Sequence, residues 1–329
     1  MKSAKPKILI ARAMFLDELT RLNEYFELEL NQEDSIFSPG ELAERLQGKF
    51  GMICTSSAQI NQDLLSKLPE LKIISTIAVG YDNFDLKACT QHQVMATNAP
   101  DVLNETTADF AWALMMATAR RVTESEHFLR AGEWTKWGVD FFVGADIHGS
   151  RLGILGMGRI GQAIARRAAG FGMEVIYHNR SRLSPELELA SHHARYVDKE
   201  TLLRESDHLI LALPYSPESH HSIAATELAQ MKSSATLINI ARGGIVDDSA
   251  LIQALKHGQI AGAGLDVFEN EPRFHPDFLA LKNVVLTPHI ASASERTRRA
   301  MVNRAIMNVI AAIRGEVPPD LLNRDVLAM

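Results

Sequence analysis

The stretch Leu152-Gly-Ile-Leu-Gly156-Met-Gly158-Arg-Ile-Gly161-Gln-Ala163 decides how the centre of this chain folds. Residues 152–155 have the apolar character of a buried strand, and a helical pattern begins at residue 159 and continues to 171. In this strand–turn–helix setting, the glycines allow a tight turn, a close approach to a pyrophosphate and close packing of helix on strand. The N–H groups of the helix N-terminus would face the phosphates. The motif therefore predicts a dinucleotide site made by Gly156, Gly158, Arg159, Ile160 and Gly161.

Further short apolar runs on both sides of this motif indicate buried parallel strands. Helical patterns lie between them, at 15–26 and after the capping-box spacing of Ser38 and Glu41. The alternation predicts an α/β chain with two doubly wound parallel-sheet domains. The expected strands are residues 7–11, 51–54, 71–77 and 94–97 in the N-terminal third, and 152–155, 174–177, 209–213, 236–240, 264–267 and 284–286 afterwards.

Two long helical stretches decide how these domains are connected. Residues 105–131 are too apolar to form a solvated linker helix, and residues 294–314 form an amphipathic helix that precedes no further strand. The simplest place for the second stretch is against the N-terminal unit. We therefore expect a discontinuous, flavodoxin-like substrate domain, residues 1–101 with 291–329, and a Rossmann NAD(P)-binding domain at 102–290. The two crossings, near residues 100 and 290, would form a hinge.

The residues after the second strand of the cofactor domain indicate which of the two nicotinamide cofactors, NADH or NADPH, is preferred. NAD-binding proteins usually carry an acidic residue here, which accepts hydrogen bonds from the ribose. This chain has Asn179, which adds no charge to repel a 2′-phosphate, and then Arg180 and Ser181, which can pair with and donate to that phosphate. The alternative is that Arg180 and Arg182 form only a solvated basic face. The pattern favours NADPH, with NADH as the second candidate.

The composition limits the classes of protein to consider. With 329 residues, 46% hydrophobic and 22% charged, the chain has the profile of a globular protein large enough for two domains. A net charge of −6 disfavours nucleic acid and anionic membranes as partners. Cys54 and Cys89 lack metal-site or disulfide-framework spacing, so we expect no metal and a reducing cytoplasm. The apolar run at 8–10 is interrupted by Arg12 and is too short for a signal peptide or membrane span.

Three polar clusters follow predicted strands late in the chain, where an open α/β sheet places its ligands. They contain Arg242, Glu271 and His289. Reduction of a 2-keto acid needs a cation that holds the carboxylate and an acid that protonates the developing alkoxide. Arg242 fits the first need and His289 the second, and Glu271 would orient and stabilise the protonated imidazole. Taken singly, each side chain could instead be a surface arginine, part of an acidic turn or a buried structural histidine.

Together the motifs give the chain a specific resemblance that covers nearly its whole length. It resembles the D-isomer-specific 2-hydroxyacid dehydrogenase family, and within it the glyoxylate, hydroxypyruvate and 2-ketogluconate reductases. The matching segments are Val79-Gly80-Tyr-Asp-Asn83, Glu105-Thr-Thr107-Ala-Asp109, Gly156-Met-Gly-Arg-Ile-Gly161, Ile238-Asn-Ile-Ala-Arg242-Gly, Gly264-Leu-Asp266-Val-Phe-Glu-Asn-Glu271-Pro and Pro288-His289.

The resemblance implies a role for each matching residue. Arg242 would bind the substrate, and His289 would be the general acid/base with Glu271 as its partner. The backbone of Val79 and Gly80 would hold the substrate carboxylate, with Ser292 at the border of the pocket. Asp266 would contact the nicotinamide carboxamide. Further cofactor contacts would come from Thr107, Leu213, Pro214, Ile240, Ala241 and His289.

The resemblance also implies a homodimer in which Trp134 or Trp137 reaches the partner subunit's active site. The pairs His192-His193 and His220-His221 match no family site, and we interpret them as surface residues. The sequence thus predicts a cytoplasmic reductase of small 2-keto acids. Two alternatives are a non-catalytic dinucleotide-sensing corepressor-like protein and a phosphoglycerate-type dehydrogenase. We expect neither, because residues 315–329 have no long proline-rich tail and no room for a regulatory domain.

Overall fold

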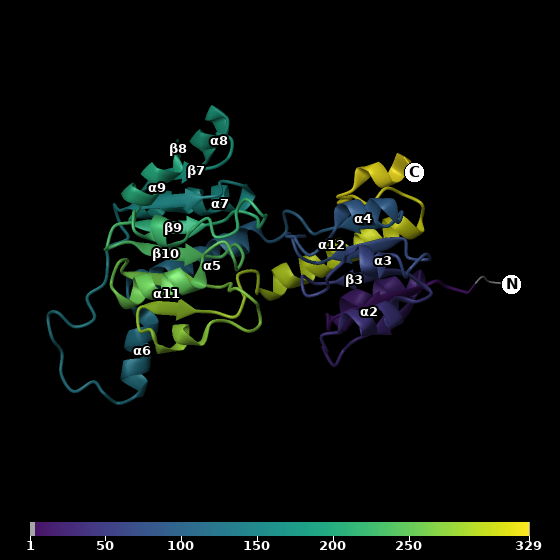
Figure 1. Cartoon of the computed structure of the whole chain (residues 1–329), viewed down its shortest axis with the longest axis horizontal. Helices are drawn as coiled ribbons and strands as arrows, with labels where there is room; N and C mark the ends of the chain where they lie inside the picture. Colours follow the sequence, from purple (N-terminus) through teal and green to yellow (C-terminus); the bar gives the residue numbers. More distant parts are fainter. Residues whose placement is uncertain (1–3, 329) are drawn as a thin grey trace. The chain divides into compact units, whose positions relative to one another are not determined.

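The computed structural model describes residues 4–328, which form two units, each built on one parallel sheet. The first unit contains the residues up to Leu103 and those from Ser294 onward, and the second is Asn104–Ala293. Helices cover both sheets (Figure 1), so the predicted α/β class with two parallel-sheet domains is confirmed. Within residues 4–328, no helix combines the length and the apolar content needed to cross a bilayer.

The first unit has a five-stranded sheet, in the order β2 (Glu27–Leu30), β1 (Lys7–Ile10), β3 (Lys49–Cys54), β4 (Ile73–Thr76) and β5 (Met95–Thr97). The long helix α12 (Glu295–Ile313), yellow in Figure 1, packs on β3 and β4. Near its start, Arg299 pairs with Asp17 at 2.7 Å in α1 (Leu16–Leu19). The other helices are α2 (Pro39–Leu46), α3 (Gln62–Leu65) and α4 (Leu86–Gln91), with 3₁₀ turns η1 (Thr20–Glu24) and η4 (Arg324–Ala328).

The second unit has a seven-stranded sheet, in the order β12 (Val284–Leu286), β11 (Gly262–Leu265), β10 (Thr236–Asn239), β9 (His208–Leu211), β6 (Arg151–Leu155), β7 (Glu174–His178) and β8 (Arg195–Tyr196). One hydrophobic cluster joins the sheet to α5 (Asn104–Ala119) and α7 (Arg159–Arg167). A separate cluster joins it to α9 (Lys199–Glu205), α10 (Ala225–Leu228) and α11 (Asp248–Lys256). The remaining elements are α6 (Val122–Arg130), α8 (Pro185–Ala190), η2 (Ala168–Phe171) and η3 (Pro276–Ala280).

The helical stretch expected over 105–131 is two helices, α5 and α6, and not one. Arg121 lies between them in the left-handed region, with φ of 52°, which ends the α-helical path. A returning segment meets the end of α5, because Ala145 donates its backbone N–H to the Ala119 carbonyl at 2.9 Å. At Gly144 a Cβ would lie 2.3 Å from the same oxygen, so only glycine fits this close crossing. Tertiary packing therefore ends α5 where the apolar pattern continues.

One other expectation about local structure was wrong, and two edge strands were missed. The helix expected over 15–26 is only the short α1 followed by the 3₁₀ turn η1. The edge strands β2 and β8 were not predicted. In β2 two glutamates alternate with two leucines, and edge strands tolerate such charged residues because they have only one neighbour. Strand β8 has only two residues, too few to show a pattern.

Candidate active site

The glycine loop after β6 has the shape of a phosphate cradle. Gly156 has φ of +101°, and a Cβ there would lie 2.6 Å from the backbone N of Leu213, so only glycine fits this turn. A Cβ on Gly161 would lie 2.3 Å from the Gly156 carbonyl oxygen, which explains the close packing of α7. At Gly158, the N-cap of α7, no atom lies within 4 Å of the Cβ position. These residues therefore fit a dinucleotide pyrophosphate at the start of the helix.

The loop after β7 is tied to this cradle by Asn179. Its Oδ1 accepts a hydrogen bond from the backbone N–H of Met157 at 2.7 Å. Arg180 and Ser181 follow with exposed side chains. Asn179 thus has a structural role that the sequence did not indicate, while its amide group brings no negative charge to the loop.

A second network fixes the far end of the same loop. Arg182 makes two hydrogen bonds of 2.8 Å to Glu188, while its side chain stays 64% exposed. The Tyr177 hydroxyl donates to Glu188 at 2.8 Å and accepts from the Leu183 N–H at 2.8 Å. The bonds from Arg182 hold the pKa of Glu188 below its ordinary value, against a smaller effect of desolvation.

Arg242 lies after β10 in a loop whose backbone is held on both sides. Asn239 donates its amide to the Arg242 carbonyl at 3.0 Å and accepts from the Ala241 N–H at 3.1 Å. On the other side, Gly243 lies against the backbone of Phe268, where a Cβ would stand 1.7 Å from the carbonyl oxygen. The backbone that carries the Arg242 side chain is therefore held by Asn239 of β10 and by Phe268 in the loop after β11.

His289 and Glu271 form a hydrogen-bonded pair, with 2.7 Å between His289 Nδ1 and Glu271 Oε2. The second carboxylate oxygen accepts from the Phe268 N–H at 2.9 Å. Burial raises the pKa of Glu271, but the hydrogen bond and charge of His289, the Phe268 N–H and the charge of Arg242 together bring it below its ordinary value. Glu271 is therefore ionised at neutral pH. Because the pair uses Nδ1, Nε2 is the ring nitrogen that can serve a substrate.

Asp266 anchors the backbone that carries His289. Its side chain is fully buried, and its Oδ1 accepts from the Ile290 N–H and from the Thr287 hydroxyl, each at 2.8 Å. Its Oδ2 accepts from the Ala291 N–H at 2.8 Å. These bonds hold His289 at φ of 53°, a left-handed conformation that is uncommon outside glycine. Only the position of Asp266 just after a strand could have indicated this anchoring role from the sequence.

The other predicted site residues lie in both units. In the first unit, Val79 and Gly80 follow β4, and Asn98 fixes their loop by donating its amide to the Val79 carbonyl at 2.7 Å. In the second unit, Thr107 is a buried residue of α5. Arg159 and Ile160 begin α7, Leu213 and Pro214 follow β9, Ile240 and Ala241 precede Arg242, and Ser292 follows β12.

The two histidine pairs do not share one environment. His193 and His220 are exposed, as expected for surface residues. The other two are half-buried and make specific contacts: His192 Nε2 lies 3.2 Å from the Met173 carbonyl oxygen, and His221 Nε2 lies 2.5 Å from Glu269 Oε1. Consecutive histidines in a loop have no sequence pattern that distinguishes an exposed ring from a half-buried one.

Known proteins resemble this chain over almost its full length. Residues 112–291 match the family described as "D-isomer specific 2-hydroxyacid dehydrogenase, NAD binding domain". The glyoxylate reductase of Thermococcus onnurineus is 46% identical over 327 residues, which are 98% of this chain and 97% of that protein. A solved structure of a glyoxylate reductase from Paecilomyes thermophila is 33% identical, with a TM-score of 0.85 and coverage of 97% of this chain and 98% of that one. The NADPH-dependent glyoxylate/hydroxypyruvate reductase of Sinorhizobium meliloti, solved with NADP and malonate, is 32% identical, with a TM-score of 0.87 and coverage of 98% of each chain.

Proposed function

Because this chain belongs to the D-isomer specific 2-hydroxyacid dehydrogenase family, as its motifs predicted, we propose that it reduces small 2-keto acids to D-2-hydroxy acids with NADPH. It is an NAD(P)-dependent 2-hydroxyacid dehydrogenase. Glyoxylate and hydroxypyruvate are the proposed substrates, and 2-ketogluconate is a further candidate. The observation that carries the proposal is the pair of His289 and Glu271, with 2.7 Å between the ring nitrogen and the carboxylate oxygen.

Each residue of the site has a different role in the proposed reduction. A bound reduced nicotinamide dinucleotide supplies the hydride that adds to the carbonyl carbon. His289 gives its Nε2 proton to the carbonyl oxygen, so that the keto acid becomes a hydroxy acid and the imidazole becomes neutral. Glu271 orients the ring and stabilises its protonated form, and Arg242 holds the substrate carboxylate and polarises the carbonyl. The backbone N–H groups of Val79 and Gly80 would bind the same carboxylate, with Ser292 at the border of the pocket.

The preference for NADPH rests on the loop after β7. Asn179 is neutral, Arg180 and Ser181 are exposed, and the carboxylate of Glu188 is already paired with Arg182. A 2′-phosphate would therefore meet the exposed Arg180, whose charge also interacts with that of Glu218, while the carboxylate of Glu188 is paired with Arg182. The proposed contacts along the rest of the cofactor are the glycine loop with Arg159 and Ile160, then Thr107, Leu213, Pro214, Ile240, Ala241, Asp266 and His289.

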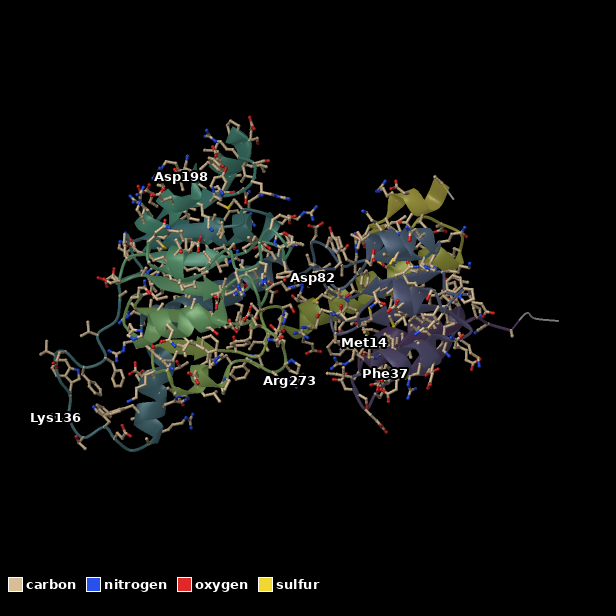
Figure 2. All side chains as sticks on the ribbon, in the orientation of Figure 1. Met14, Phe37, Asp82, Lys136, Asp198 and Arg273 are labelled. Atoms are coloured by element: carbon tan, nitrogen blue, oxygen red, sulfur yellow. The ribbon has the colours of Figure 1, made fainter. Side chains whose placement is uncertain are left out.

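We also propose that the enzyme is a homodimer. Figure 2 shows the segment around Lys136 extending away from the sheet of the second unit. Trp134 and Trp137 in this segment are 55% and 72% exposed. Glu133, which precedes Trp134, lines a groove of about 970 Å³ together with residues of α6, Phe141, Phe142 and residues from Phe278 to Leu286. Exposed apolar surface of this extent favours burial against another chain, here a second copy that receives Trp134 or Trp137 near its active site.

One kinetic panel tests the proposed function. Glyoxylate, hydroxypyruvate and 2-ketogluconate are each assayed with NADPH and with NADH, and light scattering gives the mass of the same preparation. We expect turnover of at least one keto acid, a higher kcat/KM with NADPH and the mass of a dimer. Absence of turnover with every pair would overturn the reductase assignment, and a monomeric mass would overturn the homodimer.

A further inference from the structure

A second histidine–carboxylate pair lies in the same unit as the pair of His289 and Glu271. His221 Nε2 lies 2.5 Å from Glu269 Oε1, and the two side chains are 36% and 27% exposed. Glu269 stands two residues before Glu271 in the chain. Asp247 faces the same ring, with Oδ2 4.0 Å from His221 Nδ1. Neither member of this second pair has a part in the reaction described above.

The backbone around His221 reaches the loop that carries Arg242. The His221 N–H donates to the Gly244 carbonyl at 2.7 Å, and Gly244 is two residues after Arg242. Gly244 has φ of +76°, and a Cβ there would lie 3.1 Å from Tyr215 and 3.9 Å from Glu269 Oε1. A larger residue would therefore be strained here, and the Arg242 loop is confined by the residues that surround the second pair.

His221 and Glu269 also contact neighbouring residues in the loop after β9 and at the start of α11. The rings of His220 and His221 stack with centroids 3.9 Å apart, and the Tyr215 hydroxyl lies 3.2 Å from His220 Nδ1. On the opposite side, the Glu269 N–H donates to Asp248 Oδ2 at 3.2 Å. The pair thus links the loops that follow β9, β10 and β11, all of which carry proposed cofactor or substrate contacts.

We propose that His221 and Glu269 are positioning residues, which fix the position of the loop that carries Arg242 relative to the loop that carries Glu271. The expected effect on keto acid kinetics rests on the proposed function, whereas the expected effect on the mobility of the two loops does not. Arg242 must meet a substrate carboxylate while Glu271 orients His289, and a misplacement of about 1 Å between such groups can cost about a hundredfold in rate. Breaking the pair should therefore weaken the keto acid site and leave the glycine cradle unchanged.

The test uses the full-length protein, four variants of the pair and one control variant. His221→Leu and Glu269→Leu each remove the bond, the double variant removes both partners, and His221→Gln restores a donor. His193→Ala is the matched control, because His193 is an exposed loop histidine of the same unit. For His221→Leu we expect the KM for the keto acid to rise about tenfold, with the KM for NADPH within about twofold of wild type. His221→Gln should recover most of the loss, and the double variant should be no worse than either single one.

Hydrogen exchange supplies a readout that does not depend on turnover. In His221→Leu, the amides of residues 242–246 and 268–271 should exchange faster than in wild type, while those of 156–161 should not change. If the wild type reduces no keto acid, the proposed function fails, and the exchange rates still decide the role of the pair. Unchanged exchange in these loops, an unchanged KM for the keto acid, or additive losses in the double variant would each overturn the inference. If His221→Leu does not fold, Glu269→Leu is judged by the same criteria.

Discussion

Two loop regions of the second unit handle charge in opposite ways. Around His289, the carboxylates of Asp266 and Asp248 are buried among backbone N–H groups, and burial raises the pKa of each. Around Arg180, the carboxylate of Glu188 is paired with Arg182, and its pKa is lowered. The first region therefore keeps two buried acids whose pKa is raised beside Glu271, whose pKa is lowered mainly by His289. In the second region the acid is compensated by a cation.

The difference matches what each region has to do. Proton transfer requires Arg242, Glu271 and His289 to be held in place before the substrate arrives, and buried hydrogen bonds provide this rigidity. Cofactor discrimination requires only a charge that can meet a phosphate, and an exposed Arg180 can do so without a fixed geometry. Variants of Arg242, Glu271 and His289 should therefore change catalysis, and variants of Arg180 should change the choice of cofactor.

The largest expected effect is that of His289→Ala. Loss of a positioned general acid lowers the rate by roughly a hundredfold or more, so kcat for glyoxylate should fall by at least that factor. His257→Ala, at an exposed histidine at the end of α11, is the control and should retain full activity. Steady-state kinetics with circular dichroism distinguishes lost chemistry from lost folding. Near-normal turnover in a folded His289→Ala protein would remove this histidine from the mechanism.

Arg180→Ala should have the next largest effect, confined to one cofactor. A charge-assisted hydrogen bond contributes about 1.5–3 kcal/mol, which corresponds to roughly ten- to hundredfold in kcat/KM for NADPH. NADH lacks the phosphate, so its kinetics should stay almost unchanged. Asn179→Asp, which can still accept from Met157, should shift the preference toward NADH by repelling the phosphate. An equal loss with both cofactors would mean that Arg180 is only a solvated residue, and Arg204→Ala on α9 is the matched control.

Glu271→Gln tests the charge of the catalytic pair while keeping its shape. The low pKa of Glu271 means that a negative charge faces the His289 ring at neutral pH. Glutamine can accept the same hydrogen bond but cannot stabilise the protonated ring, so the proton donor is lost at a lower pH. The alkaline limb of the pH profile for keto acid reduction should move down by roughly one pH unit, with a loss of about tenfold at pH 7.5. A profile that does not move would show that the two side chains are not coupled in catalysis.

The parts of the fold that could be predicted are those determined by local sequence. Buried parallel strands are apolar on both faces, so β1, β6 and β10 were recognised, and the glycines after β6 have the conformations that the motif requires. The break at Arg121 was missed because it depends on residues 144–145, which return to the end of α5 from a distant part of the chain. Strand β2 was missed because its charges are tolerated only at a sheet edge.

The same distinction applies to the site. Arg242, Glu271 and His289 could be proposed because each follows a strand and each has a chemical role in the reduction. The anchoring by Asp266, the bond from Met157 to Asn179 and the pair of His221 with Glu269 join residues that are 21 to 48 positions apart. A single sequence has no local pattern for such contacts, because they arise when different strands end at the same edge of the sheet.

The smallest expected effect concerns stability and uses Asp248. Its side chain is buried, and desolvation, with the nearby charge of Glu269, raises the pKa of Asp248 from 3.8 to about 6. Because the folded state binds this proton more tightly, the contribution to stability is full below pH 3.8 and is lost as the pH rises through about 6. At about 1.4 kcal/mol per pKa unit, the ionised carboxylate costs at most about 3 kcal/mol at pH 8.

Asp248→Asn keeps an oxygen that can accept from the Glu269 N–H, and it does not ionise. It loses the favourable charge at the start of α11, worth about 0.3–1 kcal/mol. We therefore expect the variant to be more stable than wild type by about 1–2 kcal/mol at pH 8, with the difference vanishing near pH 4. Glu188→Gln in the cofactor loop should do the reverse at pH 8 and reduce stability, because it removes the partner of Arg182. Urea unfolding of both variants from pH 4 to 8 measures this. If both variants changed the free energy of unfolding at pH 8 in the same direction, the contrast between the two regions would be wrong.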